Sequence, residues 1–215
     1  MVSLPTPALY PDADLPPVLR SRGMKGRMLH HAFENFDTEN SQQVDVLLAA
    51  RAYAEKFSPT AGGGLWLLGP SGTGKTHLGC AIARHIEREH RHRCWVLSVR
   101  EIIRMLRLNW GPATPSQGAY DAHAEDMIKI LGEAGLLVLD GVGVSFNTEA
   151  EAIQLLDIVD LRYKLCRPTV VISNLPAGEI KTVLGEAVFD RLREGARVLA
   201  CNWPSARGVN RAPQP

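Results

Sequence analysis

A glycine-rich turn between a short apolar run and a helical pattern carries the residues best suited to chemistry. The apolar run covers residues 64–68, and the helical pattern begins at Lys75. Between and across them lie Gly69, Pro70, Ser71, Gly72, Thr73, Gly74, Lys75 and Thr76. This is a match to G-x-x-x-x-G-K-[ST] in the strand, loop and helix context that the motif needs, so it predicts a loop that binds nucleotide phosphates.

The residue types in this turn fit a polyphosphate. Glycines let several backbone N–H groups approach an anion closely, because no side chain stands in the way. We expect Lys75 to reach the β- and γ-phosphates and the Thr76 hydroxyl to bind Mg²⁺. The following helix, whose first turn includes His77, adds the partial positive charge of its N-terminus. ATP and Mg²⁺ are therefore the expected cofactors.

Two later apolar runs end in polar residues that could complete the site. Residues 136–139 form a buried strand that ends in Asp140, a carboxylate in the position to anchor Mg²⁺ opposite the phosphate loop. Residues 168–173 form another strand, which ends at Asn174. Asn174 could position a water molecule or a γ-phosphate oxygen, or it could be a turn residue at the strand exit, since Pro176 follows two residues later.

A third set of residues lies near the helix expected over 100–108. Arg104, Arg107 and Trp110 combine basic side chains with an aromatic ring. Arginine neutralises phosphate and tryptophan offers a stacking surface for a base, so the combination favours single-stranded DNA binding. On this pattern alone, Trp110 could equally be a core or capping residue.

The elements that must position these residues alternate along the chain. We expect strands near residues 64–68, 94–99, 136–140, 168–174 and 197–201, separated by helices near residues 41–57, 75–90, 100–108, 120–133, 148–165, 180–184 and 187–192. Such alternation predicts an α/β fold with a parallel five-stranded sheet and helices on both faces. Ligands on these sheets bind at the carboxyl ends of the strands.

Length and composition limit the organisation of the chain. Its 215 residues, 45% of them hydrophobic, suffice for one α/β domain with short extensions. We expect a flexible arm over 1–30, rich in proline and then basic, one ATPase domain over 31–208 and a disordered tail over 209–215. The net charge of +1 gives no general attraction to nucleic acid, so any DNA contact requires a local patch.

The cysteines and the apolar runs exclude other classes. The four cysteines, Cys80, Cys94, Cys166 and Cys201, are scattered without a Cys-x-x-Cys pair, which argues against a zinc site or a disulfide scaffold. No signal segment and no apolar run of about 20 residues is present. We therefore expect a soluble, cytoplasmic protein without a membrane partner.

With these residues placed, the chain from about Phe33 to Arg207 resembles the DnaC/IstB-type AAA+ ATPases, most of all the DnaC-like replicative helicase loaders of bacteria and phages. Beyond the phosphate loop, the resemblance rests on residues 33–36 (FENF), 74–78 (GKTHL), 136–140 (LLVLD), 167–169 (RPT), 173–174 (SN), 190–192 (DRL) and 205–207 (SAR). It implies a P-loop AAA+ fold without a separate helical lid.

The resemblance also implies roles for individual residues. Asn174 matches the sensor 1 position, Arg191 the arginine finger offered to a neighbouring subunit, and Arg207 the sensor 2 arginine. A finger used in this way implies a homo-oligomer. The likeness further implies a replicative helicase as partner, and it strengthens the assignment of Arg107 and Trp110 to single-stranded DNA.

Three departures from the family pattern leave alternatives open. Gly141 stands where an acidic residue usually polarises the attacking water, so ATP hydrolysis is expected to be weak or absent. The segment ahead of Phe33 is shorter than the usual helicase-binding domain, and Ala206 replaces an aromatic residue. An IstB-like transposase helper and a non-hydrolysing, ATP-dependent recruitment switch therefore remain alternatives, whereas a P-loop kinase would need an acceptor pocket and an arginine-rich lid that the sequence lacks.

Overall fold

The computed structural model describes residues 21–108, 117–143 and 149–206 of the chain. Five parallel strands form its single described sheet, in the order β2-β3-β4-β1-β5. They are β1 (Gly64–Leu68), β2 (Cys94–Ser98), β3 (Leu136–Val142), β4 (Thr169–Ser173) and β5 (Ala196–Ala200). The predicted α/β class and five-stranded parallel sheet are confirmed.

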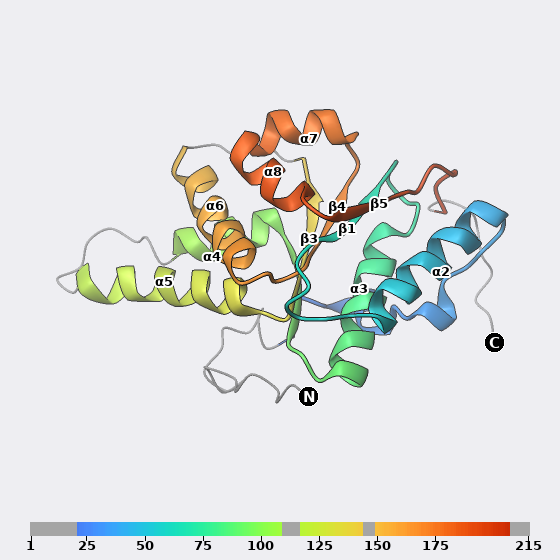
Figure 1. Cartoon of the computed structure of the whole chain (residues 1–215), viewed down its shortest axis with the longest axis horizontal. Helices are drawn as coiled ribbons and strands as arrows, with labels where there is room; N and C mark the ends of the chain where they lie inside the picture. The colour runs from blue at the N-terminus through green and yellow to red at the C-terminus, as the bar shows by residue number, and fades with distance from the viewer. Residues whose placement is uncertain (1–20, 109–116, 144–148, 207–215) are drawn as a thin grey trace.

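Helices cover both faces of this sheet, as Figure 1 shows. One face packs against α2 (Ser41–Glu55) and α3 (Lys75–His85), which continues as the π-helical turn η4 (Ile86–His90). The other face packs against α4 (Val99–Leu108), α5 (Gln117–Glu133), α6 (Glu149–Lys164), α7 (Ala177–Leu184) and α8 (Glu186–Arg193). Element types agree with the predictions, and most bounds agree within two or three residues.

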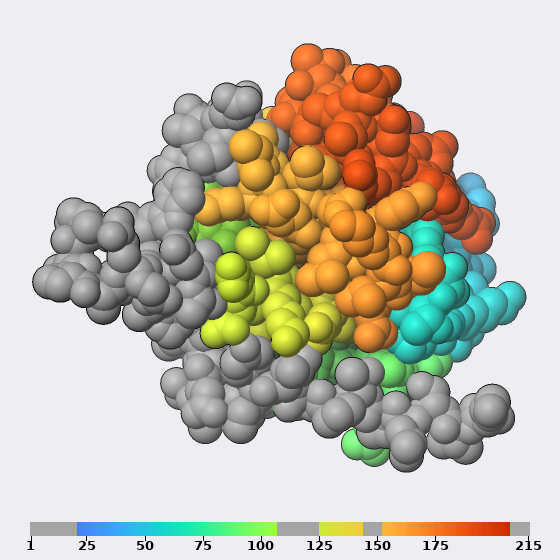
Figure 2. Space-filling model, turned by 60° about the vertical axis from the view of Figure 1, so that its left-hand side comes forward, coloured from blue at the N-terminus to red at the C-terminus, as the bar shows by residue number. Residues whose placement is uncertain are grey.

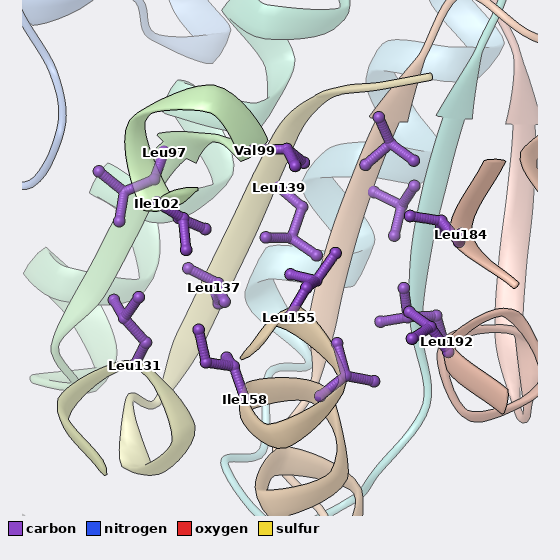
Figure 3. Close-up of a cluster of buried hydrophobic side chains, with 14 of the residues drawn as sticks. Leu97, Val99, Ile102, Leu131, Leu137, Leu139, Leu155, Ile158, Leu184 and Leu192 are labelled. Carbon is purple, nitrogen blue, oxygen red and sulfur yellow. The ribbon is translucent and has the colours of Figure 1, made fainter. Parts of the chain in front are cut away.

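The two faces receive alternate side chains of each strand. In β1, Leu65 and Leu67 point to the α2 and α3 side, whereas Trp66 and Leu68 point to the opposite side. Figure 3 shows part of the hydrophobic core on the face that includes Trp66 and Leu68. There α4, α5 and α6 pack over Leu137 and Leu139 of β3. Because β1, β2 and β4 and the first four residues of β3 are buried on both faces, their sequences are almost unbroken hydrophobic runs, whereas the edge strand β5 is largely exposed.

Local capping sets where two of the helices begin. Asn40 accepts a hydrogen bond from the Gln43 amide at 3.0 Å, and the Gln43 side chain accepts one from the Asn40 amide at 3.1 Å. Ser98 and Glu101 make the same reciprocal pair at the start of α4. These capping boxes pair backbone N–H groups that the first helical turn leaves without partners.

The chain ahead of the first long helix already packs on the domain. It contains two short 3₁₀ helices, η2 (Gly26–His30) and η3 (Phe33–Asn35). Met24 is buried, and the carbonyl of Arg22 accepts a hydrogen bond from the amide of Val96 in β2 at 2.9 Å. The domain boundary at residue 30 stays a prediction, but residues 21–30 contact the core. Within the described ranges, no helix has the length and apolar character needed to cross a membrane.

Candidate functional site

The phosphate loop between β1 and α3 opens onto a cavity of about 510 Å³ at the carboxyl ends of the strands. This is the position that the sheet topology predicts for a ligand. The loop and α3 contribute Ser71, Gly72, Gly74, Lys75, Thr76 and His77; β3 contributes Asp140 and Gly141; and β4 with its exit contributes Ile172, Ser173 and Asn174. Gly69, Pro70 and Thr73 are not among the residues that line the cavity.

Gly74 is the residue at which the loop turns into α3. Its φ of 87° lies in the left-handed region, which glycine adopts without strain. A Cβ atom there would also lie 2.6 Å from Cε2 of Phe36. Phe36, the last residue of the 33–36 motif, therefore packs against the phosphate loop at Gly74. This contact explains how a motif so far from the loop in sequence becomes part of the same site.

Lys75 is held inside the loop by backbone carbonyls. Its ammonium donates to the carbonyl oxygens of Gly69 at 2.7 Å and Pro70 at 2.6 Å, and to Oγ1 of Thr73 at 3.3 Å. The side chain is buried, and a buried ammonium requires acceptors. Phosphate oxygens are stronger acceptors than carbonyls because they carry charge, so this arrangement fits a polyphosphate that takes over these hydrogen bonds.

Thr76 and Asp140 meet across the cavity as the sequence predicts. Oγ1 of Thr76 donates to Oδ2 of Asp140 at 2.9 Å. Burial raises the pKa of Asp140, although the Thr76 hydroxyl, the Gly141 amide and the charge of Lys75 act in the opposite direction. A hydroxyl and a carboxylate oxygen at this separation are the hard ligands that Mg²⁺ prefers, and a cation there would offset the cost of burying the carboxylate.

Asn174 and His77 lie at the rim of the same site. Nδ2 of Asn174 donates to Oγ of Ser71 at 3.0 Å, so the amide at the end of β4 reaches the phosphate loop. Nε2 of His77 lies 2.8 Å from the carbonyl oxygen of Ala32, which requires the proton on Nε2. Burial lowers the pKa of His77, so the neutral ring is favoured.

Two residues of the site are absent from the sequence prediction. Arg27 and His31 line the cavity from the N-terminal segment, and the His31 ring stacks on His77 with centroids 4.3 Å apart. The only sequence signal is the basic character of residues 20–27, which includes Arg27 but not His31 and favours a solvated linker over a contact surface. The packing of η2 on α3 decides between the two, and sequence spacing does not reveal that contact.

Gly141 leaves the cavity with a single carboxylate among the described residues that line it, that of Asp140. The φ of Gly141 is 70°, and the register of β3 against β4 shifts between Leu139 and Val142. The strand therefore bulges where the family pattern places its acidic residue. Residue 141 therefore combines the absence of a side chain with a left-handed backbone conformation.

Arg191 lies at the opposite end of the sheet from the phosphate loop. It belongs to α8, ahead of the amino end of β5, and its Nε atom donates to Oδ1 of Asp160 at 2.9 Å. Its guanidinium carbon also lies 5.9 Å from the centroid of the Tyr163 ring. Arg191 cannot reach the nucleotide site of its own chain from this position, so the role assigned to it requires a second chain.

The remaining predicted residues are only partly described. Arg104 is exposed on α4, whose buried residues include Ile102, Ile103 and Leu106. Arg107 belongs to α4 by its backbone, but its side chain lies outside the described part of the structure, as do Trp110 and Arg207 entirely. The preceding residue, Ala206, is described and contacts the phosphate loop: its amide donates to the carbonyl oxygen of Gly72 at 3.0 Å.

Comparison with known proteins gives the same family as the motifs. A family profile described as "IstB-like ATP binding protein" matches residues 20–212. Replicative helicase loader DnaC of Buchnera aphidicola subsp. Schizaphis graminum is 30% identical over 191 residues, which cover 88% of this chain and 74% of that protein. DnaC of Escherichia coli (strain K12) is 30% identical over 184 residues, covering 84% of this chain and 71% of the relative.

A crystal structure of the DnaC helicase loader shares the fold. It superimposes with a TM-score of 0.69 at 22% identity, over 82% of this chain and 99% of that one. Together with the sequence comparisons, this confirms the predicted resemblance and the AAA+ fold.

Proposed function

The chain belongs to the IstB-like ATP-binding family, and we propose that it is an ATP-dependent AAA+ protein of DNA replication that helps to load a replicative helicase onto single-stranded DNA. The observation that carries the nucleotide part is the Thr76–Asp140 hydrogen bond beside the loop that encloses Lys75. The helicase part comes from the DnaC relatives, whose name states that activity.

Bound ATP would be held by residues of this chain in distinct ways. Backbone amides of the loop and the ammonium of Lys75 would bind the phosphates, and Thr76 with Asp140 would hold Mg²⁺, which neutralises phosphate charge. Asn174 would contact the γ-phosphate side, because it already reaches Ser71. Arg27 and His31 would cover the nucleotide from the N-terminal segment, since both line the cavity.

A complete nucleotide site would also require Arg191 from a second copy of the chain and Arg207 from the C-terminal segment of the same chain. Arg191 would act on the nucleotide of a neighbouring subunit, which is supported by its position at the far end of the sheet and implies a homo-oligomer. Arg207 would approach the phosphates of its own chain, because Ala206 is already hydrogen bonded to the loop. A guanidinium at the γ-phosphate increases phosphoryl-transfer rates by roughly 10³-fold or more.

Hydrolysis would be slow, so the protein would act mainly as an ATP-dependent switch. Asp140, the only carboxylate on the described cavity lining, is already hydrogen bonded to the Thr76 hydroxyl. Without a general base at the attacking water, a factor of about 10² to 10⁴ in rate is missing. A chain that holds ATP longer than it hydrolyses it would remain in the assembled, partner-binding state.

An IstB-like transposase helper is the second candidate, because the matching family profile is described as an IstB-like ATP binding protein and the motifs that give the resemblance do not separate helpers from loaders. Both candidates use the same nucleotide site, so the site does not separate them. Co-purification from the native host distinguishes them: a hexameric helicase among the captured proteins supports the loader, and a transposase supports the helper.

The nucleotide site is tested by isothermal titration calorimetry with ATP, with and without Mg²⁺. Lys75→Ala should abolish the heat of binding, whereas Lys181→Ala, an exposed lysine paired with Glu186, should leave it unchanged. Equal ATP affinity of the Lys75→Ala chain and the wild type would exclude the proposed site.

DNA binding is tested by fluorescence anisotropy with a single-stranded oligonucleotide in the presence of Mg²⁺ and ATP. Replacement of Arg104, Arg107 and Trp110 by alanine should weaken binding and reduce the salt slope by about 0.7 for each phosphate that is no longer neutralised. Arg88→Ala, an exposed arginine beyond α3, is the control. An unchanged slope in the triple variant would return that stretch to the core or capping interpretation.

A further inference from the structure

A second cavity, of about 470 Å³, lies at the amino ends of the strands, away from the nucleotide site. Gly62 and Gly63 ahead of β1, Thr169 of β4 and Gly195 ahead of β5 form its floor, and the ends of α6 and α8 form its sides. Figure 2 shows this face, where orange atoms of α6 lie between the red-orange α8 and the cyan segment that leads into β1. We call it the α6–α8 cavity.

The charged residues among those that line the α6–α8 cavity are mostly basic. Arg162, Lys164, Arg167 and Arg191 contribute to its wall, and Glu194 is the one acidic residue among the described residues that line it. Glu194 accepts a hydrogen bond from the Tyr163 hydroxyl at 2.8 Å. Asp160 pairs with both Lys164 and Arg191 at the edge of the cavity.

Arg162 is a fully buried cation with neutral partners. Its guanidinium donates to Oγ1 of Thr169 at 2.9 Å and to the carbonyl oxygens of Leu131 at 2.6 Å and Ala134 at 3.0 Å. Burial lowers the pKa of Arg162 to about 9, and the neighbouring charge of Arg167 acts in the same direction. The hydroxyl and carbonyl groups that accept these hydrogen bonds carry no negative charge. They therefore do not neutralise the positive charge of Arg162 at the base of the cavity.

Arg167 carries an unsatisfied donor in the same wall. It donates from NH1 to the carbonyl oxygen of Pro59 at 3.2 Å, whereas its buried Nε atom has no hydrogen-bond partner in the described chain. Its charge acts on two other basic groups, Arg162 and His92, and lowers the pKa of each. A buried N–H group without an acceptor is costly, so the described chain compensates the Arg167 cation only in part.

We propose that the α6–α8 cavity is a second anion site, which binds phosphate oxygens through Arg167 and Arg191. Planar guanidinium groups suit this ligand, because they offer paired N–H donors to a tetrahedral oxyanion. The phosphate has two sources: a free polyphosphate, or the triphosphate held by the nucleotide site of a second copy. The second source rests on the proposed function, and Arg167 then joins Arg191 as a residue that acts between subunits.

The first experiment isolates the cavity from the nucleotide site. The full chain with Lys75→Ala is titrated with inorganic triphosphate by calorimetry. Residual binding should weaken about tenfold or more when Arg167→Gln is added, because this variant removes a charge-assisted hydrogen bond. Arg193→Gln is the matched control, since that exposed arginine donates to Ala196 and does not line the cavity.

The second experiment tests contact between copies. Self-association of the otherwise wild-type chain is measured by sedimentation velocity with Mg²⁺ and ATP. Arg167→Gln should weaken ATP-dependent association about tenfold while the ATP affinity of the dilute chain stays unchanged. Should Arg167→Gln fail to fold, Arg167→Lys carries both experiments, because it keeps the positive charge but removes the planar set of paired N–H donors.

Together, the two experiments distinguish a free polyphosphate from the triphosphate of a second copy. They also distinguish failure of this proposal from failure of the proposed nucleotide site. Triphosphate binding to the Lys75→Ala chain that depends on Arg167 supports a free polyphosphate, and an effect on self-association alone supports a second copy. Absence of both effects overturns the proposal. Failure of the proposed nucleotide site is seen separately, as an ATP titration of the wild-type chain that shows no heat or is insensitive to Lys75→Ala.

Discussion

The substitution Gly141→Glu restores the acidic residue that the family places after Asp140, at a position with an unusual backbone. The φ of Gly141 is 70°, and a Cβ atom there would meet nothing within 4 Å. Steric clash is therefore absent, and the cost is the left-handed conformation itself, about 1 to 2 kcal/mol for a residue with a side chain. For a domain of this size that corresponds to a decrease of roughly 2 to 8 °C in Tm.

The expected gain is in hydrolysis. Gly141 lines the nucleotide cavity beside Asp140, so we expect a carboxylate attached there to reach the water that attacks the γ-phosphate. General-base assistance contributes about 10² to 10⁴ in rate. We expect Gly141→Glu to release phosphate about 10² times faster than Gly141→Gln, the control with the same length and backbone strain but no base.

The assay is steady-state phosphate release at saturating Mg²⁺ and ATP, over a range of protein concentrations that allows Arg191 to act between chains. Thermal unfolding of both variants is measured alongside. Equal phosphate release by the Glu and Gln chains would show that residue 141 does not face the attacking water. An unchanged Tm in both would refute the left-handed backbone at Gly141.

Two further predictions concern stability. Arg162→Leu should lower the free energy of unfolding by about 3 kcal/mol or more in urea titrations, because it leaves the carbonyls of Leu131 and Ala134 buried without a donor. The exposed Arg104→Leu should change it by less than about 0.5 kcal/mol, and similar losses for both variants would show that the Arg162 hydrogen bonds do not stabilise the fold. Burial lowers the pKa of His31 and His77 in the fold, so the unfolded chain binds protons more tightly, and Tm should fall as the pH drops below the unperturbed 6.5. His77→Gln should reduce that pH dependence, and an identical pH profile for the variant and the wild type would contradict it.

The nucleotide site shows how far local sequence information reaches. The loop ending at Thr76 and the strand ending at Asp140 are recognisable because each is a short pattern whose chemistry and secondary structure agree. Parallel strands align their carboxyl ends, so two such patterns are brought together by topology alone. The proximity of Thr76 and Asp140 can therefore be predicted from the two motifs and from the parallel order of the strands, and the hydrogen bond between them agrees with it.

Other parts of the site depend on contacts between distant segments. Arg27 and His31 reach the cavity only because η2 packs on α3, and the basic pattern of residues 20–27 by itself favours a solvated linker. The pairing of Arg191 with Asp160 and the unsatisfied Nε of Arg167 likewise arise where α6, α8 and the amino ends of the strands converge. No periodicity or motif in the sequence predicts these contacts between distant segments.

The sequence by itself determined the phosphate loop, the carboxylate of Asp140 at the end of an apolar strand and the order of alternating elements, because these are set by neighbours a few residues apart. Tertiary structure alone decided the left-handed backbone at Gly141, the N-terminal residues at the nucleotide cavity and the positive α6–α8 cavity. Those features are fixed by packing between segments far apart in the chain, and burial then sets the electrostatic cost of each charge they enclose.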